Sequence, residues 1–270
     1  MTAIVMIFLA VLGASIGSFL SVIIYRIKHR QKGALGGRSR CPHCKKNLAT
    51  YDLIPVLNYI LLGGHCRYCN EPISIYYFFL EITTALVFLL MYLRFPFIME
   101  GGILNDYGMD WSVFLQYFFA TVNGTLLVGM FFFDLQYLEV PNLLLYPFIA
   151  LSLLGSVLSG TPDFPSIIIA IAGAIVFFGG QRLLSRGKWL GEGDIYVAIG
   201  MAAMFGWKLF IIAVSLSYII GAVLCIVLLT TKALKVKSKI PFAPFLVFGT
   251  FATILYGNEI LSWYLNLINI

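Results

Sequence analysis

Two aspartates stand in apolar stretches of this chain, where a carboxylate facing lipid would be unfavourable. Asp134 lies in F-F-F-D-L-Q-Y-L-E-V-P-N and Asp194 lies in G-E-G-D-I-Y-V-A-I-G. An ionised Asp at the centre of a membrane helix costs roughly 2.5–3.5 kcal/mol on insertion scales, so an acid in such a place indicates a functional site. Two carboxylates that share one proton can act as general base and general acid in amide hydrolysis. The pair therefore predicts an aspartic hydrolase.

Other roles fit each aspartate taken alone. Either carboxylate can accept N–H groups at a helix N-terminus, and Asp194 is well placed to do so because it opens a predicted helix. Either can also pair with a buried Lys or Arg, or carry protons along an ion pathway. Position alone therefore leaves catalysis, capping and ion transport open.

Four of the five cysteines form two C-x-x-C knuckles, Cys41–Cys44 and Cys66–Cys69, separated by 21 residues. This spacing is typical of a tetrahedral four-thiolate zinc site. The alternatives are a pair of disulfides or redox-active dithiols. His43 and His65 lie beside the knuckles as substitute ligands, although Cys41, Cys44, Cys66 and Cys69 already supply four. Cys225, alone in an apolar span, is predicted to be a small core residue.

The elements that must position these groups are membrane helices. The chain is 60% hydrophobic and 11% charged, with a mean hydropathy of +0.93, which excludes an ordinary soluble domain. Apolar runs that can cross about 30 Å of hydrocarbon lie at roughly 4–25, 75–95, 113–133, 143–160, 166–184, 209–231 and 245–268, with a shorter run at 195–207. The sequence predicts an all-α polytopic membrane protein of about eight transmembrane helices, with a small zinc-binding cytoplasmic loop domain.

The distribution of Lys and Arg predicts the orientation of these helices. With the N-terminus outside, only Arg94 and Lys208 of the 18 basic residues fall in outer segments, in agreement with the positive-inside rule. Both termini then lie outside, and the zinc loop and both aspartates lie towards the cytoplasm. Basic residues of two inner loops, at 26–32 and 232–239, contribute to this bias. The net charge of +6 indicates contact with anionic lipids rather than nucleic acid.

We expect three parts: a first transmembrane helix (1–25), the cytoplasmic zinc-binding loop domain (26–74) and a transmembrane aspartic peptidase core (75–270). The run 195–207 has only 13 residues, about 20 Å of helix, so this helix should begin below the membrane surface. Gly191 and Gly193 permit an irregular backbone before it, which is tolerated at that depth only where it lines water or protein. Asp194 is therefore expected in a wet cavity.

Several motifs taken together resemble one family. They are G-x-G-D at the start of a span, D-x6-P-N at the end of an earlier span, and two C-x-x-C knuckles in the first long loop. This combination is similar to the type IV prepilin peptidases, the bifunctional leader peptidase/N-methyltransferases of bacterial pilus, type II secretion and competence systems. The likeness covers nearly the whole chain, from Gly17-Ser18-Phe19-Leu20 to Pro241-Phe242-Ala243-Pro244-Phe245.

The resemblance implies a multi-pass protein of the bacterial inner membrane that cleaves a prepilin or pseudopilin after a glycine, with Asp134 and Asp194 as the catalytic acids. It also implies that the new N-terminal residue is methylated with S-adenosylmethionine as donor. Glu81, an acid inside the second span, is a candidate for that site, although an ion pair or a hydrogen bond to a neighbouring helix explains it equally well. No G-x-G-x-x-G opens a predicted βα unit, so methyl transfer is implied by the resemblance alone.

Three positions depart from the family pattern. Tyr196 stands where the family usually has a lysine, Tyr76 where a basic residue is common, and Ala243 where a glycine is common. Two alternatives stay open: a peptidase without methyltransferase activity, and a proton-coupled transporter with a zinc-stabilised loop whose aspartates carry protons.

A helical substrate must unwind before its peptide bond can be cleaved, and its freed backbone groups then need partners. Pro241 and Pro244 cannot sustain regular helix hydrogen bonding, and they lie at the cytoplasmic level assigned to the aspartates. We therefore expect residues 240–245 to form an extended edge that pairs with the substrate in the manner of strand addition. The predicted substrate-binding residues are Gly191, Gly193, Pro241, Phe242 and Pro244.

Overall fold

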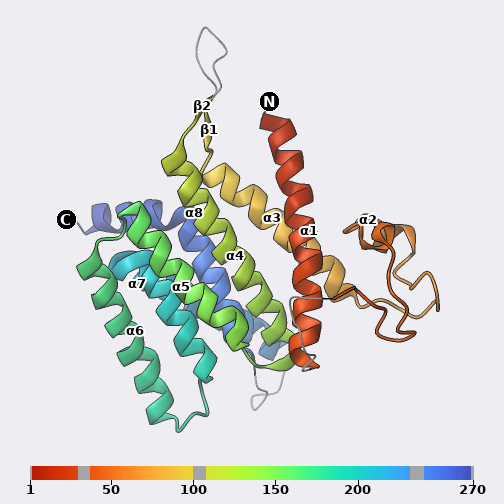
Figure 1. Ribbon diagram of the computed structural model, residues 1–270. Helices are drawn as coiled ribbons and strands as arrows, with labels where there is room; N and C mark the ends of the chain where they lie inside the picture. The colour runs from red at the N-terminus through yellow and green to blue at the C-terminus, as the bar shows by residue number, and fades with distance from the viewer. Residues whose placement is uncertain (1, 30–36, 100–107, 232–239, 269–270) are drawn as a thin grey trace. The chain divides into compact units, whose positions relative to one another are not determined.

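The computed structural model describes residues 2–29, 37–99, 108–231 and 240–268 (Figure 1). The basic residues Arg30 and Lys32, and those between 232 and 239, lie outside the described residues. The α-helices are α1 (Thr2–Lys28), α2 (Leu57–Leu61), α3 (Ile75–Arg94), α4 (Trp111–Tyr137), α5 (Asn142–Ser159), α6 (Phe164–Leu184), α7 (Glu192–Thr230) and α8 (Ala243–Leu267), with a 3₁₀ turn η1 (Thr50–Leu53) and two short strands, β1 (Ile98–Met99) and β2 (Gly108–Met109). Within the described residues, seven helices are long and apolar enough to cross a membrane. The chain is an all-α, multi-pass membrane protein.

The chain divides into two compact units, Met1–Asp110 and Trp111–Ile270. In the first unit α1 packs against α3, and the packing is close because a Cβ on Gly17 would lie 2.8 Å from the Glu81 Cα. The segment between these helices carries both cysteine knuckles, η1 and α2. Strands β1 and β2 pair antiparallel, with Ile98 opposite Met109.

In the second unit α7 packs against α5, α6 and α8, and α4 packs against α5 and α8. Small residues permit two of these contacts. A Cβ on Gly200 of α7 would overlap the Phe148 ring of α5, and one on Gly249 of α8 would lie 2.5 Å from the carbonyl oxygen of Ala213 in α7. Small residues at helix contacts are typical of membrane proteins, in which van der Waals packing drives helix association.

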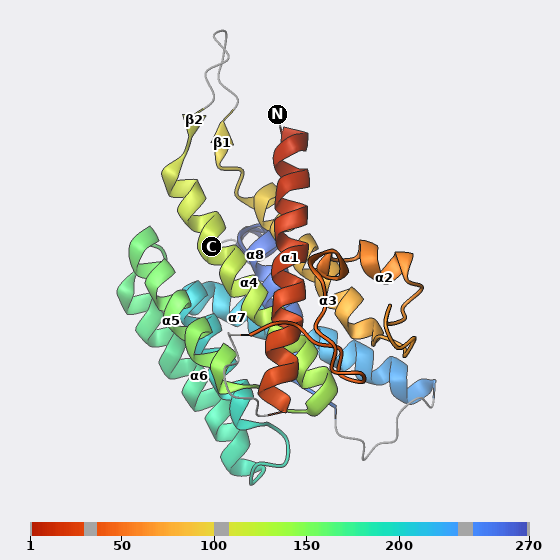
Figure 2. The same ribbon diagram turned by 45° about the vertical axis from the view of Figure 1, so that its right-hand side comes forward.

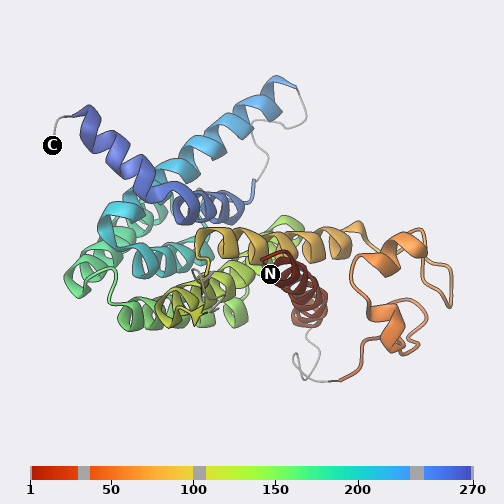
Figure 3. The same cartoon turned by 90° about the horizontal axis from the view of Figure 1, so that it is seen from above.

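The expected spans 195–207 and 209–231 correspond to the two helical parts of α7, which meet directly at Gly206. Gly206 has non-helical backbone angles, φ +64° and ψ 179°, and Figure 3 shows that the two parts point in different directions. The left-handed φ favours glycine, and a Cβ there would also lie 2.7 Å from the Pro162 Cβ. The Ser166 hydroxyl accepts the N–H of Trp207 at 3.1 Å, which satisfies a donor beside the break. The expected division into two helices is therefore confirmed, and the junction lies at Gly206 rather than at residue 208.

The expectation of an extended edge at residues 240–245 was also wrong for most of the segment. Helix α8 begins at Ala243 and contains Pro244 in its first turn, while Phe242 has φ −97° and ψ −30°. A proline is accommodated in the first turn of a helix because the N–H that it lacks has no intrahelical acceptor there. Ile240, Pro241 and a bend at Phe242 precede the helix.

Candidate active site

Asp134 and Asp194 come from different helices of the second unit and lie close enough for their charges to interact. Asp134 is near the end of α4 and Asp194 is in the first turn of α7. Both are buried, with 5% and 7% of their surface exposed. The end of one helix and the start of another thus bring together two carboxylates that are 60 residues apart in the sequence.

Asp194 does cap its own helix. Its Oδ2 atom accepts the N–H of Gly191 at 2.9 Å, so the third residue of α7 holds the residue that precedes the helix. Gly193 has a separate reason to be glycine, because a Cβ there would lie 2.8 Å from the Val140 Cβ. The G-x-G-D motif therefore allows the start of α7 to approach the α4–α5 connection closely. Capping and electrostatic contact with Asp134 coexist in one carboxylate.

The Asp134 carboxylate accepts the backbone N–H of Ala243, the first residue of α8. The preceding residue, Phe242, packs its ring 5.2 Å from the Tyr218 ring and 6.4 Å from the Phe178 ring. Tyr218 donates a hydrogen bond to Gln181 at 2.9 Å and lies within electrostatic range of Asp194. Phe242 is among the residues predicted from the sequence, whereas Phe178, Gln181 and Tyr218 were missed, because a single Phe, Tyr or Gln in an apolar span carries no distinguishing pattern. Phe242 and Ala243 thus link the first turn of α8 to the acid pair.

The four cysteines predicted as metal ligands come together in the first unit. The sulfur atoms of Cys41, Cys44, Cys66 and Cys69 all lie within 4.8 Å of one another, and the Cys41 and Cys69 sulfurs are 3.9 Å apart. Tetrahedral zinc with Zn–S bonds of about 2.3 Å requires S–S distances of about 3.8 Å. The donor set and its spacing therefore fit zinc. His43 and His65 are exposed, and His65 Nδ1 is engaged with the Gly63 carbonyl at 2.8 Å.

Both knuckles share one backbone conformation. The N–H of Lys45 bonds to the Cys41 carbonyl at 3.0 Å, and that of Asn70 bonds to the Cys66 carbonyl at 2.9 Å. Lys45 and Asn70 both have positive φ, +58° and +57°.

The pKa of the Cys69 thiol is lowered by a hydrogen bond from the backbone N–H of Glu71, but burial and the neighbouring thiols raise it to about 12. A bound cation would be needed to deprotonate Cys69, as metals do with coordinated thiols.

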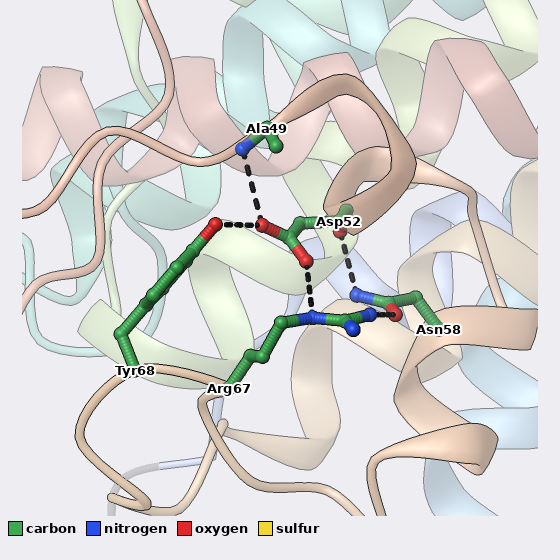
Figure 4. Close-up of polar contacts among 5 residues, drawn as sticks. All are labelled: Ala49, Asp52, Asn58, Arg67 and Tyr68. Atoms are coloured by element: carbon green, nitrogen blue, oxygen red, sulfur yellow. Dashed lines mark hydrogen bonds and ion pairs between the residues drawn. The ribbon is translucent and has the colours of Figure 1, made fainter.

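Asp52 joins the second knuckle to the preceding segment (Figure 4). Its carboxylate accepts hydrogen bonds from Arg67 Nε at 2.8 Å, from Tyr68 Oη at 2.7 Å and from the Ala49 N–H at 3.1 Å. Burial alone would raise the pKa of Asp52, but the bonds from Tyr68, Ala49 and Arg67 outweigh it and hold the pKa below its ordinary value. The same bond raises the pKa of the Tyr68 phenol. This network fixes the two residues between Cys66 and Cys69.

Glu81 is buried in α3 and accepts two hydrogen bonds. One comes from the Val56 N–H to Glu81 Oε2 at 2.7 Å, and the other comes from the Ser18 hydroxyl of α1. Val56 has φ +63° and ψ −55°, and the Leu57 N–H bonds to the Pro55 carbonyl at 2.6 Å. These values describe a strained γ-turn, which is unfavourable for a β-branched residue. Glu81 therefore fastens a strained loop segment to the helix pair.

Ser18 and Glu81 also line a cavity of about 470 Å³ in the first unit, together with Arg26, Asp52 and Arg67. The volume is that of a small-molecule or cofactor site. Aromatic side chains contribute to the walls, among them Tyr25 and Tyr68, and so do Cys41 and Cys66 of the four-cysteine cluster. The cavity thus combines apolar surface, charges of both signs and the proposed metal site.

Comparison with known proteins identifies two family matches. Residues 11–95 match the model described as the Bacterial Peptidase A24 N-terminal domain, and residues 121–226 match the model of the Type IV leader peptidase family. The second match contains both aspartates, and the first contains the four cysteines and Glu81. No solved structure matches the chain.

Three relatives illustrate the match, and each is named a prepilin leader peptidase/N-methyltransferase. The protein of Aeromonas hydrophila is 28% identical over 277 residues, which cover 93% of this chain and 90% of the relative. That of Bacillus subtilis (strain 168) is 26% identical over 96% of this chain and 97% of the relative. That of Myxococcus xanthus (strain DK1622) is 32% identical over 83% of this chain and 63% of the relative. The chain belongs to the type IV leader peptidase family.

Proposed function

We propose that this protein is a membrane aspartic endopeptidase that removes the leader from prepilin-like proteins after a glycine, and that it N-methylates the residue exposed by cleavage. The observation that carries the proposal is the pair of buried carboxylates, Asp134 and Asp194, within the segment that matches the leader peptidase model. The names of the relatives favour both activities over a peptidase alone and over a transporter.

In the proposed mechanism Asp134 and Asp194 share one proton. The ionised carboxylate takes a proton from water as the water attacks the scissile carbonyl, and the protonated carboxyl gives its proton to the carbonyl oxygen. When the intermediate breaks down, the first acid passes the proton it took from water to the leaving amine, and the second recovers its proton from the hydroxyl of the intermediate. The N–H of Gly191 orients Asp194, and the N–H of Ala243 orients Asp134. In each acid one carboxylate oxygen is therefore held by a backbone N–H, and the other oxygen is available to substrate and water.

Substrate binding is proposed to involve Gly191, Gly193, Pro241, Phe242 and Pro244. Gly191 and Gly193 flank Glu192 at the start of α7. The absent side chain of Gly191 would allow a peptide backbone to approach Asp194, whereas Gly193 would act by keeping the start of α7 close to Val140. Phe242 lies one residue before the N–H that contacts Asp134. With residues 243–245 in helix, pairing to the substrate would be confined to the backbone of Ile240 and Pro241.

Methyl transfer is proposed to use the 470 Å³ cavity of the first unit. S-adenosylmethionine would supply the methyl group there. The ligand carries a carboxylate and an adenine, which the arginines and aromatic rings of the cavity can contact. Glu81 lies at its wall, where a carboxylate can bind the substrate amine. Zinc held by Cys41, Cys44, Cys66 and Cys69 would supply folding energy to the loop that forms the cavity.

The protein is proposed to lie in the bacterial inner membrane with both termini outside and the zinc loop and aspartates towards the cytoplasm. The bias of Lys and Arg supports this orientation. The break at Gly206 supports it as well, because α7 can then cross the membrane twice and keep the number of crossings even. Its membrane partners would be the prepilin or pseudopilin helix and anionic lipids.

One reaction tests both activities. Purified protein in vesicles is incubated with a prepilin and labelled S-adenosylmethionine, and the mass of the product is determined. We expect loss of the leader and a gain of one methyl group. Loss of the leader without methylation would support the peptidase activity only. An unchanged prepilin would refute the proposal.

A further inference from the structure

We infer that α2 and the turn before it lie in the lipid bilayer, so that this part of the cysteine loop is embedded in the membrane rather than dissolved in the cytoplasm. The residues concerned, called here the α2 apolar face, are Ile54, Leu57, Ile60 and Leu61. Their exposed fractions are 48%, 59%, 59% and 81%. A water-facing loop domain rarely gathers such exposure in one segment of eight residues.

The face has the spacing of an amphipathic helix. Leu57 of α2 is followed three and four residues later by Ile60 and Leu61, which places these three on one side of the helix, while Ile54 lies in the extended backbone before the turn. The remaining side chains of α2 are bound to the protein. Asn58 donates to the Asp52 carbonyl at 2.8 Å, and the Tyr59 ring lies 5.1 Å from the Phe78 ring of α3. One side of α2 therefore contacts α3 and the polar network, while the other side is left apolar and exposed.

The hydrogen bond between Val56 and Glu81 places this segment at membrane depth. Helix α3 has 20 residues, about 30 Å, which is only the thickness of the hydrocarbon layer. Glu81 is six residues after Ile75, so it lies about 9 Å along the helix from its start. Since the Val56 N–H is 2.7 Å from Glu81 Oε2, the backbone that begins α2 is inside the layer that α3 must cross. Figure 2 shows α2 beside α3.

Backbone at this depth must have its hydrogen bonds satisfied within the protein. The segment meets this requirement. Besides the bond to Glu81, the N–H groups of Leu57, Asn58, Ile60 and Leu62 bond to the carbonyls of Pro55, Ile54, Val56 and Asn58 at 2.6–3.2 Å. A buried carboxylate is the strong acceptor that a strained, water-deprived N–H requires. This explains both the positive φ of Val56 and the acid in α3.

Lipid is a better occupant of this face than a second protein because the face continues a surface that must already contact lipid. In the first turns of α3, Ile75 and Phe79 are 52% and 49% exposed, and α3 is a membrane span. The ion pair of Asp52 and Arg67 contacts α2 through Asn58, which is not part of the apolar face: Asn58 donates to the Asp52 carbonyl at 2.8 Å and accepts from Arg67 at 3.4 Å. A helix with an apolar side and a polar side is typical of the lipid–water boundary.

Spin labelling of the full chain tests the inference. A nitroxide is attached to Leu61→Cys, or in a second variant to Leu57→Cys, in a Cys225→Ser background, and the protein is placed in nanodiscs of phosphatidylethanolamine and phosphatidylglycerol. Thr50→Cys, an exposed site of the same loop, is the matched control. Zinc content confirms that each variant keeps its fold. Collision with oxygen, which concentrates in lipid, is compared with collision with a water-soluble nickel chelate.

We expect labels at Leu61 and Leu57 to favour oxygen over the chelate several-fold, and the label at Thr50 to favour the chelate. Equal chelate access at all three positions would place α2 in water and overturn the inference. A label shielded from both reagents, with spin–spin coupling between chains, would overturn it as well and show that a second copy covers the face.

Discussion

Glu81 of the first unit and Asp194 of the second are both buried acids at the level of membrane helices, and each accepts one backbone N–H. The donors of these hydrogen bonds differ. Asp194 accepts the N–H of Gly191, three residues before it, whereas Glu81 accepts the N–H of Val56, 25 residues before it. A second carboxylate, Asp134, lies within electrostatic range of Asp194, while Glu81 receives an additional hydrogen bond from Ser18.

This difference separates two uses of an acid in an apolar environment. The bond from Gly191 is local and moves with its own helix, so it orients a carboxylate whose charge is then available for chemistry. The bond from Val56 closes a long loop, so the carboxylate acts as an acceptor that fixes one segment on another. Replacement of each acid by its amide distinguishes these uses, because Asn and Gln keep an acceptor oxygen but cannot ionise.

The largest effect is expected in the second unit. Asp134→Asn and Asp194→Asn should each reduce leader removal by at least about 10²–10⁴-fold, the usual contribution of a general acid or base. In the Asp194→Asn variant the amide oxygen would still cap α7, so insertion and zinc content should be unchanged. Prepilin cleavage in vesicles measures the loss.

Glu139→Gln provides the matched control, because Glu139 is an exposed acid five residues after Asp134 and should be dispensable. Residual cleavage above a few per cent of wild type in either Asp variant would contradict a mechanism in which the two acids share a proton.

A second large effect is expected at the metal site. Cys41→Ser removes one of four thiolates and should abolish stoichiometric zinc binding, because a structural zinc site requires all its ligands. Loss of the metal should unfold the loop between the two helices of the first unit while the spans stay inserted. Elemental analysis and limited proteolysis between residues 29 and 74 measure this. Cys225→Ser should retain the metal, and zinc retention by Cys41→Ser would remove Cys41 from the ligand set.

Sequence alone reached the acids and the thiolates because their chemistry is unusual in its setting. A carboxylate in an apolar span and a repeated C-x-x-C carry information at a single position. The seven long helices followed from hydropathy in the same way. The backbone N–H groups that bond to the acids, those of Val56, Gly191 and Ala243, could not be predicted because they have no sequence signature. Which N–H group reaches an acid depends on where the chain turns.

Two boundaries differed from expectation for related reasons. Hydropathy separated the two parts of α7 correctly, but it locates a polar residue and not a backbone break, so it placed their junction at residue 208 instead of at Gly206. Proline was interpreted as preventing helix throughout 240–245, yet Pro244 occupies the first turn of α8, where its missing N–H has no consequence. In both cases the local residue was compatible with two structures, and tertiary packing selected one.

Replacement of Glu81 tests its role as a hydrogen-bond acceptor. Glu81→Ala leaves the Val56 N–H buried without an acceptor, which costs about 1–3 kcal/mol. This loss should increase proteolytic opening of the loop by roughly one to two orders of magnitude. Glu81→Gln keeps an acceptor oxygen and should restore most of the protection. Limited proteolysis of zinc-loaded protein measures both. If Gln is as damaging as Ala to loop protection, Glu81 acts through its charge and not as an acceptor.

Methylation by the same two variants adds a second readout. If Glu81 also binds the substrate amine, Glu81→Gln should lose methyl transfer while its loop stays protected and leader removal is unchanged. Full methylation by Glu81→Gln would assign Glu81 to loop positioning alone.

The smallest effect is expected within the Asp52 network. Tyr68→Phe removes one hydrogen bond to the Asp52 carboxylate, while the bonds from Arg67 and Ala49 remain. The loss should be the smallest of the series, a rise of only about a few-fold in proteolytic opening of the loop. Tyr59→Phe is the control, because Tyr59 contributes its ring to the contact with Phe78 and should show no comparable change.

The pH dependence of that difference follows from the protonation of its two partners. The pKa of Asp52 is lowered below its ordinary value of 3.8, so its charge stabilises the fold above that value, and the contribution is lost as the pH falls through the lower, folded value. The pKa of Tyr68 is raised by the bond to Asp52, so the phenol remains a donor in neutral and mildly alkaline solution. The difference between wild type and Tyr68→Phe should therefore be constant from about pH 5 to about pH 8. A difference that changed across this range would show that another titrating group, and not Asp52, accepts the phenol hydrogen.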